Sequence, residues 1–293
     1  MRFPSIVTPE GRVAVGPDCV EAPAPTYDSA RRHSPVIEEF VELWRYRDLV
    51  VQLVRRDVVA RYKRSLLGVV WTMLNPLVTT LVLTAVFSQS FGSRGAYAVY
   101  VLCGLIAWNF FAQATVSAMR QLVWGSALLH RIYVPRTIFA VTAVGTGLVN
   151  MALALIPLGI VLVASGLSLR PALLLTPLAV GLLGAFAFGI GLLLSTLAAR
   201  FVDVVDLYEL GLPLLLYLTP IIYPADILPE RIRWLAVELN PLHRLIALFR
   251  DPLYEGTWPA PLAIGVGAAC AVIAFAAGWI VFTRQADEFP YRV

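Results

Sequence analysis

Six long apolar runs constrain the fold of this chain more than any other feature of its sequence. At 1.5 Å of rise per residue, each run is long enough as a helix to cross a hydrocarbon core of about 30 Å. Only 14% of the residues are charged and 59% are hydrophobic, which excludes an average soluble domain. The sequence therefore predicts an all-α integral membrane protein with six transmembrane helices. The runs lie at residues 65–91, 97–119, 137–164, 172–198, 204–222 and 259–283.

The cations beside these runs predict the orientation of the chain. With a cytoplasmic N-terminus, the segments expected inside carry thirteen Lys and Arg residues, whereas the two short outer loops carry only Arg94 and Arg170. We therefore expect a multi-pass protein of the cytoplasmic membrane with both termini in the cytoplasm. The long connection at 223–258 would lie outside, and near 229–238 and 242–254 it contains two short amphipathic stretches, interpreted as re-entrant helices.

Two N-terminal segments precede the first run. Residues 1–35 are rich in proline with balanced charge, which is typical of a disordered tail. Residues 36–64 place apolar side chains at helical spacing among seven cations, which predicts an amphipathic helix in the headgroup layer of the membrane. A helix packed on a soluble partner is the alternative. The predicted domain order is completed by a six-span unit at 65–283 and a cytoplasmic tail at 284–293.

The single lysine excludes nucleotide hydrolysis through a P-loop. That motif ends in Gly-Lys followed by Ser or Thr, but Lys63 lies between Tyr62 and Arg64. Any nucleotide-driven step must come from another polypeptide. The cysteines and histidines lack metal-ligand spacing, so we expect no metal and no cofactor on this chain.

The apolar runs contain almost no ionisable groups. Asp206 and Glu209 are the only charged residues within them. Ion-driven carriers need ionisable groups or broken-helix ion sites within the membrane, and membrane enzymes need an acid pair, a metal cluster or a nucleophile beside a base. The sequence therefore argues against both classes.

Neutral polar and aromatic residues do occur in the runs. Aromatic rings there are typical of interfacial anchors, but they could also line a conduit on which sugar rings stack. Asn75 is more specific, because the following proline disrupts the helix and an amide in a membrane seeks a partner. The residues of this kind are Trp71, Asn75, Phe87, Phe91, Trp108, Asn109, Phe110, Gln113, Tyr208, Tyr217 and Tyr223.

Four motifs resemble those of the ABC-2 type permeases that export cell-surface polysaccharides. The first joins the basic segment to the first run, and the others follow in order along the chain. At the third motif, Phe201 and Val202 are inserted before the first aspartate, so the charge spacing of the family is altered there. The motifs are Arg56-Asp57 with Arg61-Tyr62-Lys63, Ser65-Leu66-Leu67-Gly68, Trp71 and Asn75-Pro76; His130 to Arg136; Arg200 to Asp206; and Asn240-Pro241-Leu242 with Phe249-Arg250-Asp251.

The resemblance implies a permease that forms a homodimer and binds two copies of a separate ATPase subunit, which would hold the ATP and Mg²⁺. The implied substrate is a lipid-linked polysaccharide of the O-antigen, teichoic acid or cell-wall galactan type. Membrane lipids are expected contacts, and nucleic acid is not. The alternatives are an ABC-2 exporter of small drugs or lipids and an ion-driven glycolipid flippase.

Candidate residues are assigned to four roles, three of which are implied by the resemblance. The basic segment is our own hypothesis for the lipid-pyrophosphate site, because guanidinium groups bind phosphates in bidentate fashion; positive-inside anchoring is its alternative. The coupling residues would be Arg131, Tyr133, Val134, Pro135 and Arg136; the pyrophosphate residues Arg55, Arg56, Arg61, Lys63 and Arg64; the conduit residues Trp71, Asn75, Phe87 and Tyr217; and the outer-gate residues Asn240, Pro241, Phe249 and Arg250.

Overall fold

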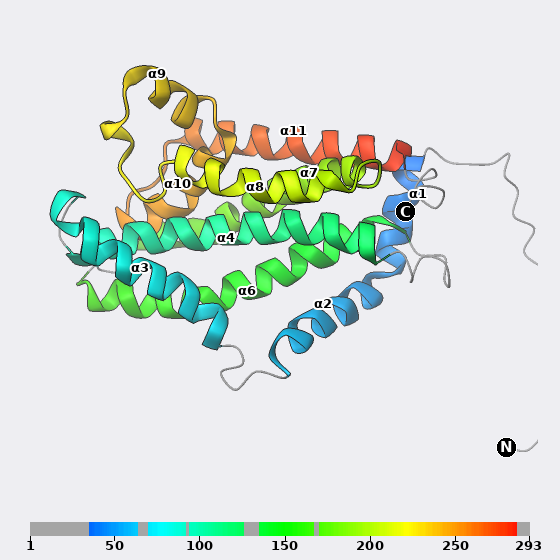
Figure 1. Cartoon of the computed structure of the whole chain (residues 1–293), viewed down its shortest axis with the longest axis horizontal. Helices are drawn as coiled ribbons and strands as arrows, with labels where there is room; N and C mark the ends of the chain where they lie inside the picture. Colours follow the sequence, from blue (N-terminus) through cyan, green and yellow to red (C-terminus); the bar gives the residue numbers. More distant parts are fainter. Residues whose placement is uncertain (1–34, 64–69, 92–93, 126–134, 167–169, 286–293) are drawn as a thin grey trace, which may run out of the picture. The chain divides into compact units, whose positions relative to one another are not determined.

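The computed structural model describes residues 35–63, 70–91, 94–125, 135–166 and 170–285, and the regular secondary structure in these ranges is helical throughout (Figure 1). The all-α prediction is confirmed for them. The predicted tails at 1–35 and 284–293 lie almost entirely outside the described residues. The long helices are α3 (Val70–Phe91), α4 (Arg94–Trp124), α6 (Thr137–Ala164), α7 (Thr176–Ala198), α8 (Asp203–Leu218) and α11 (Pro261–Gln285).

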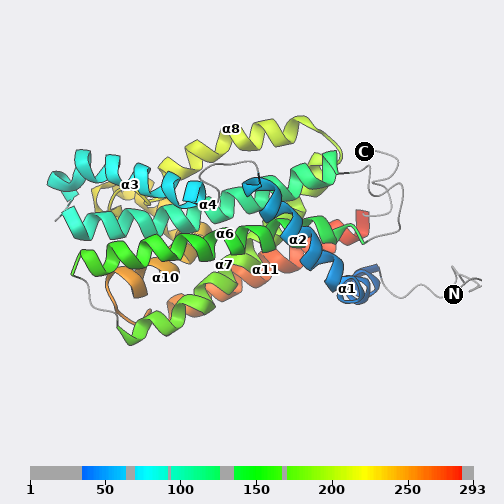
Figure 2. The ribbon, with the colours of Figure 1, turned by 90° about the horizontal axis from the view of Figure 1, so that it is seen from below.

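Helix α4 is the central element of the bundle. It packs against α3, α6, α7 and α8, and against the short helix α10 (Pro241–Tyr254). Figures 1 and 2 show α4 running along α6 in two perpendicular views. Its residues from Val99 to Trp108 are nearly all buried. A helix that is apolar on every side suits this position, because no side faces water.

Helices α7 and α11 approach each other closely at two glycines. A Cβ added to Gly189 would collide with the backbone of Ala274, and one added to Gly278 would collide with the backbone of Gly189. Small residues allow membrane helices to pack at such short range.

Helices α3 and α8 have extensive exposed apolar surface. Leu81 on α3 and Leu210 on α8 are each 72% exposed. Such a surface is unfavourable in water and is expected where lipid or another membrane helix covers it.

Within the described ranges, five helical stretches are long and apolar enough to cross a membrane, and they coincide with five of the six predicted runs. The remaining run, 204–222, forms α8, whose 16 residues end at Leu218, and the chain then turns through residues 219–223. The five are Met73–Ser90, Ala96–Trp124, Thr137–Ala164, Pro171–Ala198 and Pro261–Gln285.

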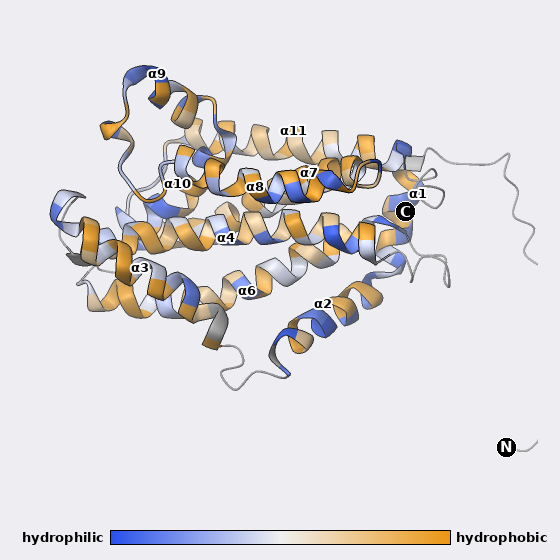
Figure 3. Ribbon diagram, viewed as in Figure 1, coloured by the Kyte–Doolittle hydropathy of each residue, from blue (hydrophilic) through white to orange (hydrophobic). Residues whose placement is uncertain are grey.

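The predicted amphipathic helix at 36–64 is two helices in the structure. They are α1 (Pro35–Arg45) and α2 (Arg47–Tyr62), which meet at Tyr46. The ring of Phe40 on α1 packs edge-on against Trp279 of α11, and α2 packs on α6. Figure 3 shows hydrophilic and hydrophobic residues alternating around α2.

Short elements form the connection between α8 and α11. The 3₁₀ turn η3 (Ala225–Ile227) precedes α9 (Glu230–Arg233), which continues as a π-helical turn, η4 (Trp234–Glu238). Asn240 then caps α10, because its side-chain oxygen accepts hydrogen bonds from the backbone N–H groups of Leu242 and His243. The two predicted short helices are therefore present, and η2 (Pro171–Leu175) forms another short turn before α7.

Candidate functional site

The basic side chains of α2 lie on its exposed surface. Arg56 pairs with Asp57 at 2.8 Å, and Arg61 reaches Gln113 of α4 at the long distance of 3.4 Å. Arg55 and Lys63 form no ion pair or hydrogen bond with any other described residue. Arg64 lies outside the described residues. Arg55 and Lys63 are thus available to a ligand, and together with Arg56 and Arg61 we call them the α2 cations.

Two polar contacts join α2 and α8 to the Trp124 end of α4. Gln121 donates a hydrogen bond to Asp57 of α2 at 3.0 Å, and Arg120 pairs with Glu209 of α8 at 2.6 Å. Glu209, one of the two acidic residues inside the apolar runs, therefore has a basic partner.

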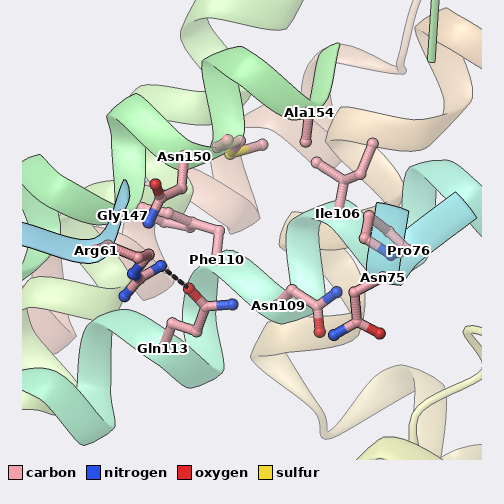
Figure 4. A pocket seen from close by; sticks show the side chains of 11 residues that line it. Arg61, Asn75, Pro76, Ile106, Asn109, Phe110, Gln113, Gly147, Asn150 and Ala154 are labelled. Carbon is pink, nitrogen blue, oxygen red and sulfur yellow. Dashed lines mark hydrogen bonds between the residues drawn. The ribbon is translucent and has the colours of Figure 1, made fainter. Parts of the chain in front are cut away.

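A polar cavity of about 140 Å³ lies between α2, α3, α4 and α6 (Figure 4). Four amides and one guanidinium line it, together with apolar side chains such as Phe110. Sequence analysis singled out Asn75, but it missed Asn150, which is an isolated amide in a long apolar run with no neighbouring motif. The polar residues of the cavity are Arg61, Asn75, Asn109, Gln113 and Asn150.

The four predicted conduit residues do not gather in this cavity. Asn75 lines it, but Phe87 lies three turns further along α3 and is 37% exposed. Tyr217 projects from α8 and is 64% exposed. Trp71 lies in α3, and its side chain is outside the described part of the chain.

The predicted coupling segment is described only at its end. Pro135 is buried and Arg136 is partly buried, and Arg131, Tyr133 and Val134 lie outside the described residues. Directly after this segment, the backbone N–H and hydroxyl of Thr137 each donate a hydrogen bond to Glu39 of α1 at 3.1 Å. The start of α6 is thereby tied to α1.

At the Tyr97 end of α4, three side chains hold the turn that follows α8, and we call them the carbonyl clamp: Tyr97, Tyr100 and Arg250. The Tyr97 hydroxyl donates to the carbonyl of Ile222 at 2.7 Å. The Tyr100 hydroxyl lies 3.3 Å from the carbonyl oxygen of Pro220 and 3.0 Å from that of Tyr223.

Arg250 completes the carbonyl clamp from α10. Its guanidinium donates to the carbonyl of Pro220 at 3.2 Å and lies 4.2 Å from the ring centre of Tyr100, a cation–π contact. Its Nε lies 3.7 Å from the carboxylate of Asp251. Arg250 is only 8% exposed, so these contacts compensate for removing the charge from water.

The other predicted gate residues flank the carbonyl clamp. Asn240 donates to the hydroxyl of Thr219 at 2.9 Å, and Phe249 is completely buried. Burial raises the pKa of Asp251 to about 6, and burial together with the positive charges of Arg250 and Arg244 lowers the pKa of His243 to about 4.

The apolar helices of spanning length define a multi-pass membrane protein. The family model described as "ABC-2 type transporter" matches residues 48–254, and the chain belongs to this family. The resemblance inferred from the motifs is confirmed.

Curated relatives cover most of the chain. This chain is 30% identical over 258 residues to "O-antigen export system permease protein RfbA" of Myxococcus xanthus, and the matched region covers 86% of this chain and 98% of the relative. A protein of the same name from Klebsiella pneumoniae is 28% identical over 213 residues, spanning 72% of this chain and 82% of the relative.

Proposed function

We propose that this chain is the permease subunit of an ATP-driven exporter that moves a lipid-linked polysaccharide across the cytoplasmic membrane. The similarity to a named O-antigen export permease over 98% of that relative's length is the observation that carries the proposal. The proposed polysaccharide is of the O-antigen, teichoic acid or cell-wall galactan type.

The proposed topology has six spans with both termini in the cytoplasm, and α8 with its following turn forms the fifth span. At 1.5 Å per residue, the 16 residues of α8 cover about 24 Å, and the turn held by the carbonyl clamp supplies the remaining length. Helices α1 and α2 then lie along the cytoplasmic interface, where the α2 cations meet phosphate groups.

A second copy of the chain is proposed to cover the exposed faces of α3 and α8. The side chains of α3 are neutral, and those of α8 after Glu209 are neutral and largely apolar. Phe87 and Tyr217 are exposed on these two helices. Between two copies, these rings and Trp71 would line the conduit. Residues 223–258, with Asn240, Pro241, Phe249 and Arg250, would close its outer end.

ATP hydrolysis is assigned to two copies of a separate ABC ATPase. The chain has no P-loop sequence, so the energy must arrive through a protein contact. The segment from Arg131 to Arg136 is the proposed contact. Its link to α1 through Thr137 and Glu39 offers a mechanical connection to α2.

The test is transport in proteoliposomes containing this chain, an ABC ATPase encoded beside it, and lipid-linked polysaccharide. We expect ATP-dependent movement of the glycan that requires both proteins. Movement that follows an ion gradient without ATP would instead support a flippase, and ATP-dependent movement of drugs or phospholipids without glycan movement would support the other ABC-2 class.

A further inference from the structure

The polar cavity contains amides that have no partner in the described part of the protein. Asn75 lies in the apolar stretch Met73–Ser90 and Asn109 in the stretch Ala96–Trp124. Both side chains line the cavity, and neither forms a hydrogen bond with another described residue. In a membrane, a polar group without a partner is costly, and the contents of the cavity can supply one.

The size of the cavity limits what those contents can be. A volume of about 140 Å³ accommodates several waters, each of which occupies about 30 Å³ in the liquid, or one ring-sized polar group. Gly147 helps to set this volume, because a Cβ at that position would lie 3.1 Å from the ring of Phe110.

The lining favours a hydroxyl-bearing ring with an attached phosphate. A side-chain amide both donates and accepts hydrogen bonds, as a sugar hydroxyl does. The side chains of Phe110, Ile106 and Met151 offer apolar surface to the C–H face of a ring. Figure 4 shows Arg61, Gln113 and Asn150 at one end of the cavity and Asn75 and Asn109 at the other.

Arg61 supplies the charge at one end. Its guanidinium has five N–H donors, and within the described residues its one hydrogen bond is the 3.4 Å contact with Gln113. Most of its donors are therefore open to an anion, and a phosphate matches their planar arrangement.

From this geometry we infer that the cavity binds the sugar ring next to the phosphate of the lipid-linked substrate. Asn75 and Asn109 bind its hydroxyls, and Arg61 binds the phosphate. This inference rests on the proposed function, and it adds a sugar-reading site within one protomer to the cations of α2.

The test is equilibrium binding to the purified chain in phosphatidylcholine nanodiscs, with no ATPase present. The probes are farnesyl diphosphates that carry one sugar, namely N-acetylglucosamine, galactose or rhamnose, and farnesyl methyl diphosphate, which has the same charge and no sugar. We expect at least one sugar-bearing probe to bind the unmodified chain about tenfold more tightly than the methyl compound, the effect of one or two hydrogen bonds.

Substitutions then separate the two ends of the cavity. Asn109→Leu should abolish the preference for the sugar-bearing probe, and Gly147→Ala should reduce it by moving Phe110 into the cavity. Arg61→Gln should weaken both kinds of probe about three- to tenfold. Gln89→Leu is the matched control, because it replaces an exposed amide on α3 outside the cavity and should change neither affinity.

Equal binding of all probes to the unmodified chain, a result that needs no substitution, would overturn the inference and leave the cavity a hydrated space. So would a sugar preference that survives Asn109→Leu. The two assays on the unmodified chain distinguish the two proposals. If the sugar-bearing probe binds more tightly but no ATP-dependent transport occurs, the proposed function alone is contradicted. If transport occurs but all probes bind equally, this site alone is contradicted.

Discussion

Arg250 and Arg61 are the same residue type in two opposite environments. Arg250 is 8% exposed and contacts a carbonyl oxygen, an aromatic ring and a carboxylate, whereas Arg61 is exposed and has one long hydrogen bond within the described residues. A buried guanidinium with several partners holds structure, and an exposed one with open donors is available to a ligand. The carbonyl clamp and the α2 cations should therefore respond very differently to substitution.

The largest effect on stability is expected at Arg250. Arg250→Leu removes the donor to the Pro220 carbonyl and leaves Asp251 without its partner, so we expect a loss of about 2–4 kcal/mol in stability. Thermal unfolding of the purified protein in detergent measures this change. The matched control is Arg244→Leu on the same helix, whose partly exposed pair with Glu238 should contribute less than about 1 kcal/mol. Equal losses would contradict the distinction between buried and exposed arginines.

The pH dependence of stability tests the surroundings of Arg250. The pKa of the Asp251 carboxyl is about 6 in the folded protein against an ordinary 3.8, so its titration lowers the stability of the protein as the pH rises from about 4 to 6. The pKa of the His243 imidazole is about 4 in the folded protein against an ordinary 6.5, so its titration raises the stability of the protein over nearly the same pH range. The two effects oppose each other, so we expect a nearly level unfolding temperature between pH 4 and 6.5.

Single substitutions should expose each component of that balance. Asp251→Asn should make stability rise with pH, and His243→Asn should make it fall, by about 1–2 kcal/mol across the window after allowance for the one-third exposure of Asp251. A level profile in both variants would show that neither group titrates in this range.

A smaller effect is expected from the Tyr100 hydroxyl. Tyr100→Phe keeps the ring beneath Arg250 but leaves the Tyr223 carbonyl without this donor, so we expect a loss of about 1 kcal/mol. The same unfolding assay measures it, and Tyr254→Phe is the control, because no hydrogen bond of its hydroxyl is found among the described contacts. A loss as large as that of Arg250→Leu would mean that the hydroxyl, not the cation, holds the turn.

The smallest effect on stability is expected on α2. Arg55→Gln should change the free energy of unfolding by no more than about 0.5 kcal/mol, because its side chain is exposed and has no described partner. In the transport assay, however, the same variant should slow export if the α2 cations bind the diphosphate. Unchanged export would favour the alternative that these cations only anchor the helix to the membrane surface.

Sequence patterns sufficed to predict the membrane helices and the family. Apolar runs uninterrupted by charge can form little else in a bilayer, because a helix satisfies its own backbone. Five of the six runs accordingly appear as helices of spanning length. The single helix predicted at 36–64 was wrong in detail, because the chain bends at Tyr46 so that α1 can pack on α11 and α2 on α6. Such a bend depends on distant partners that the local pattern does not contain.

For the candidate sites, too, the sequence indicated individual residues and the structure showed which of them lie together. Motifs and charge identified Arg61, Asn75 and Arg250 as individual residues, because a cation or an amide stands out beside an apolar run. Only the tertiary structure placed Asn75 and Asn150, 75 positions apart in the chain, in one cavity, and turned Arg250 inward onto Tyr100. Hydrophobicity is a property that each residue carries along the chain, whereas a cavity or a clamp exists only after helix packing has brought distant side chains together.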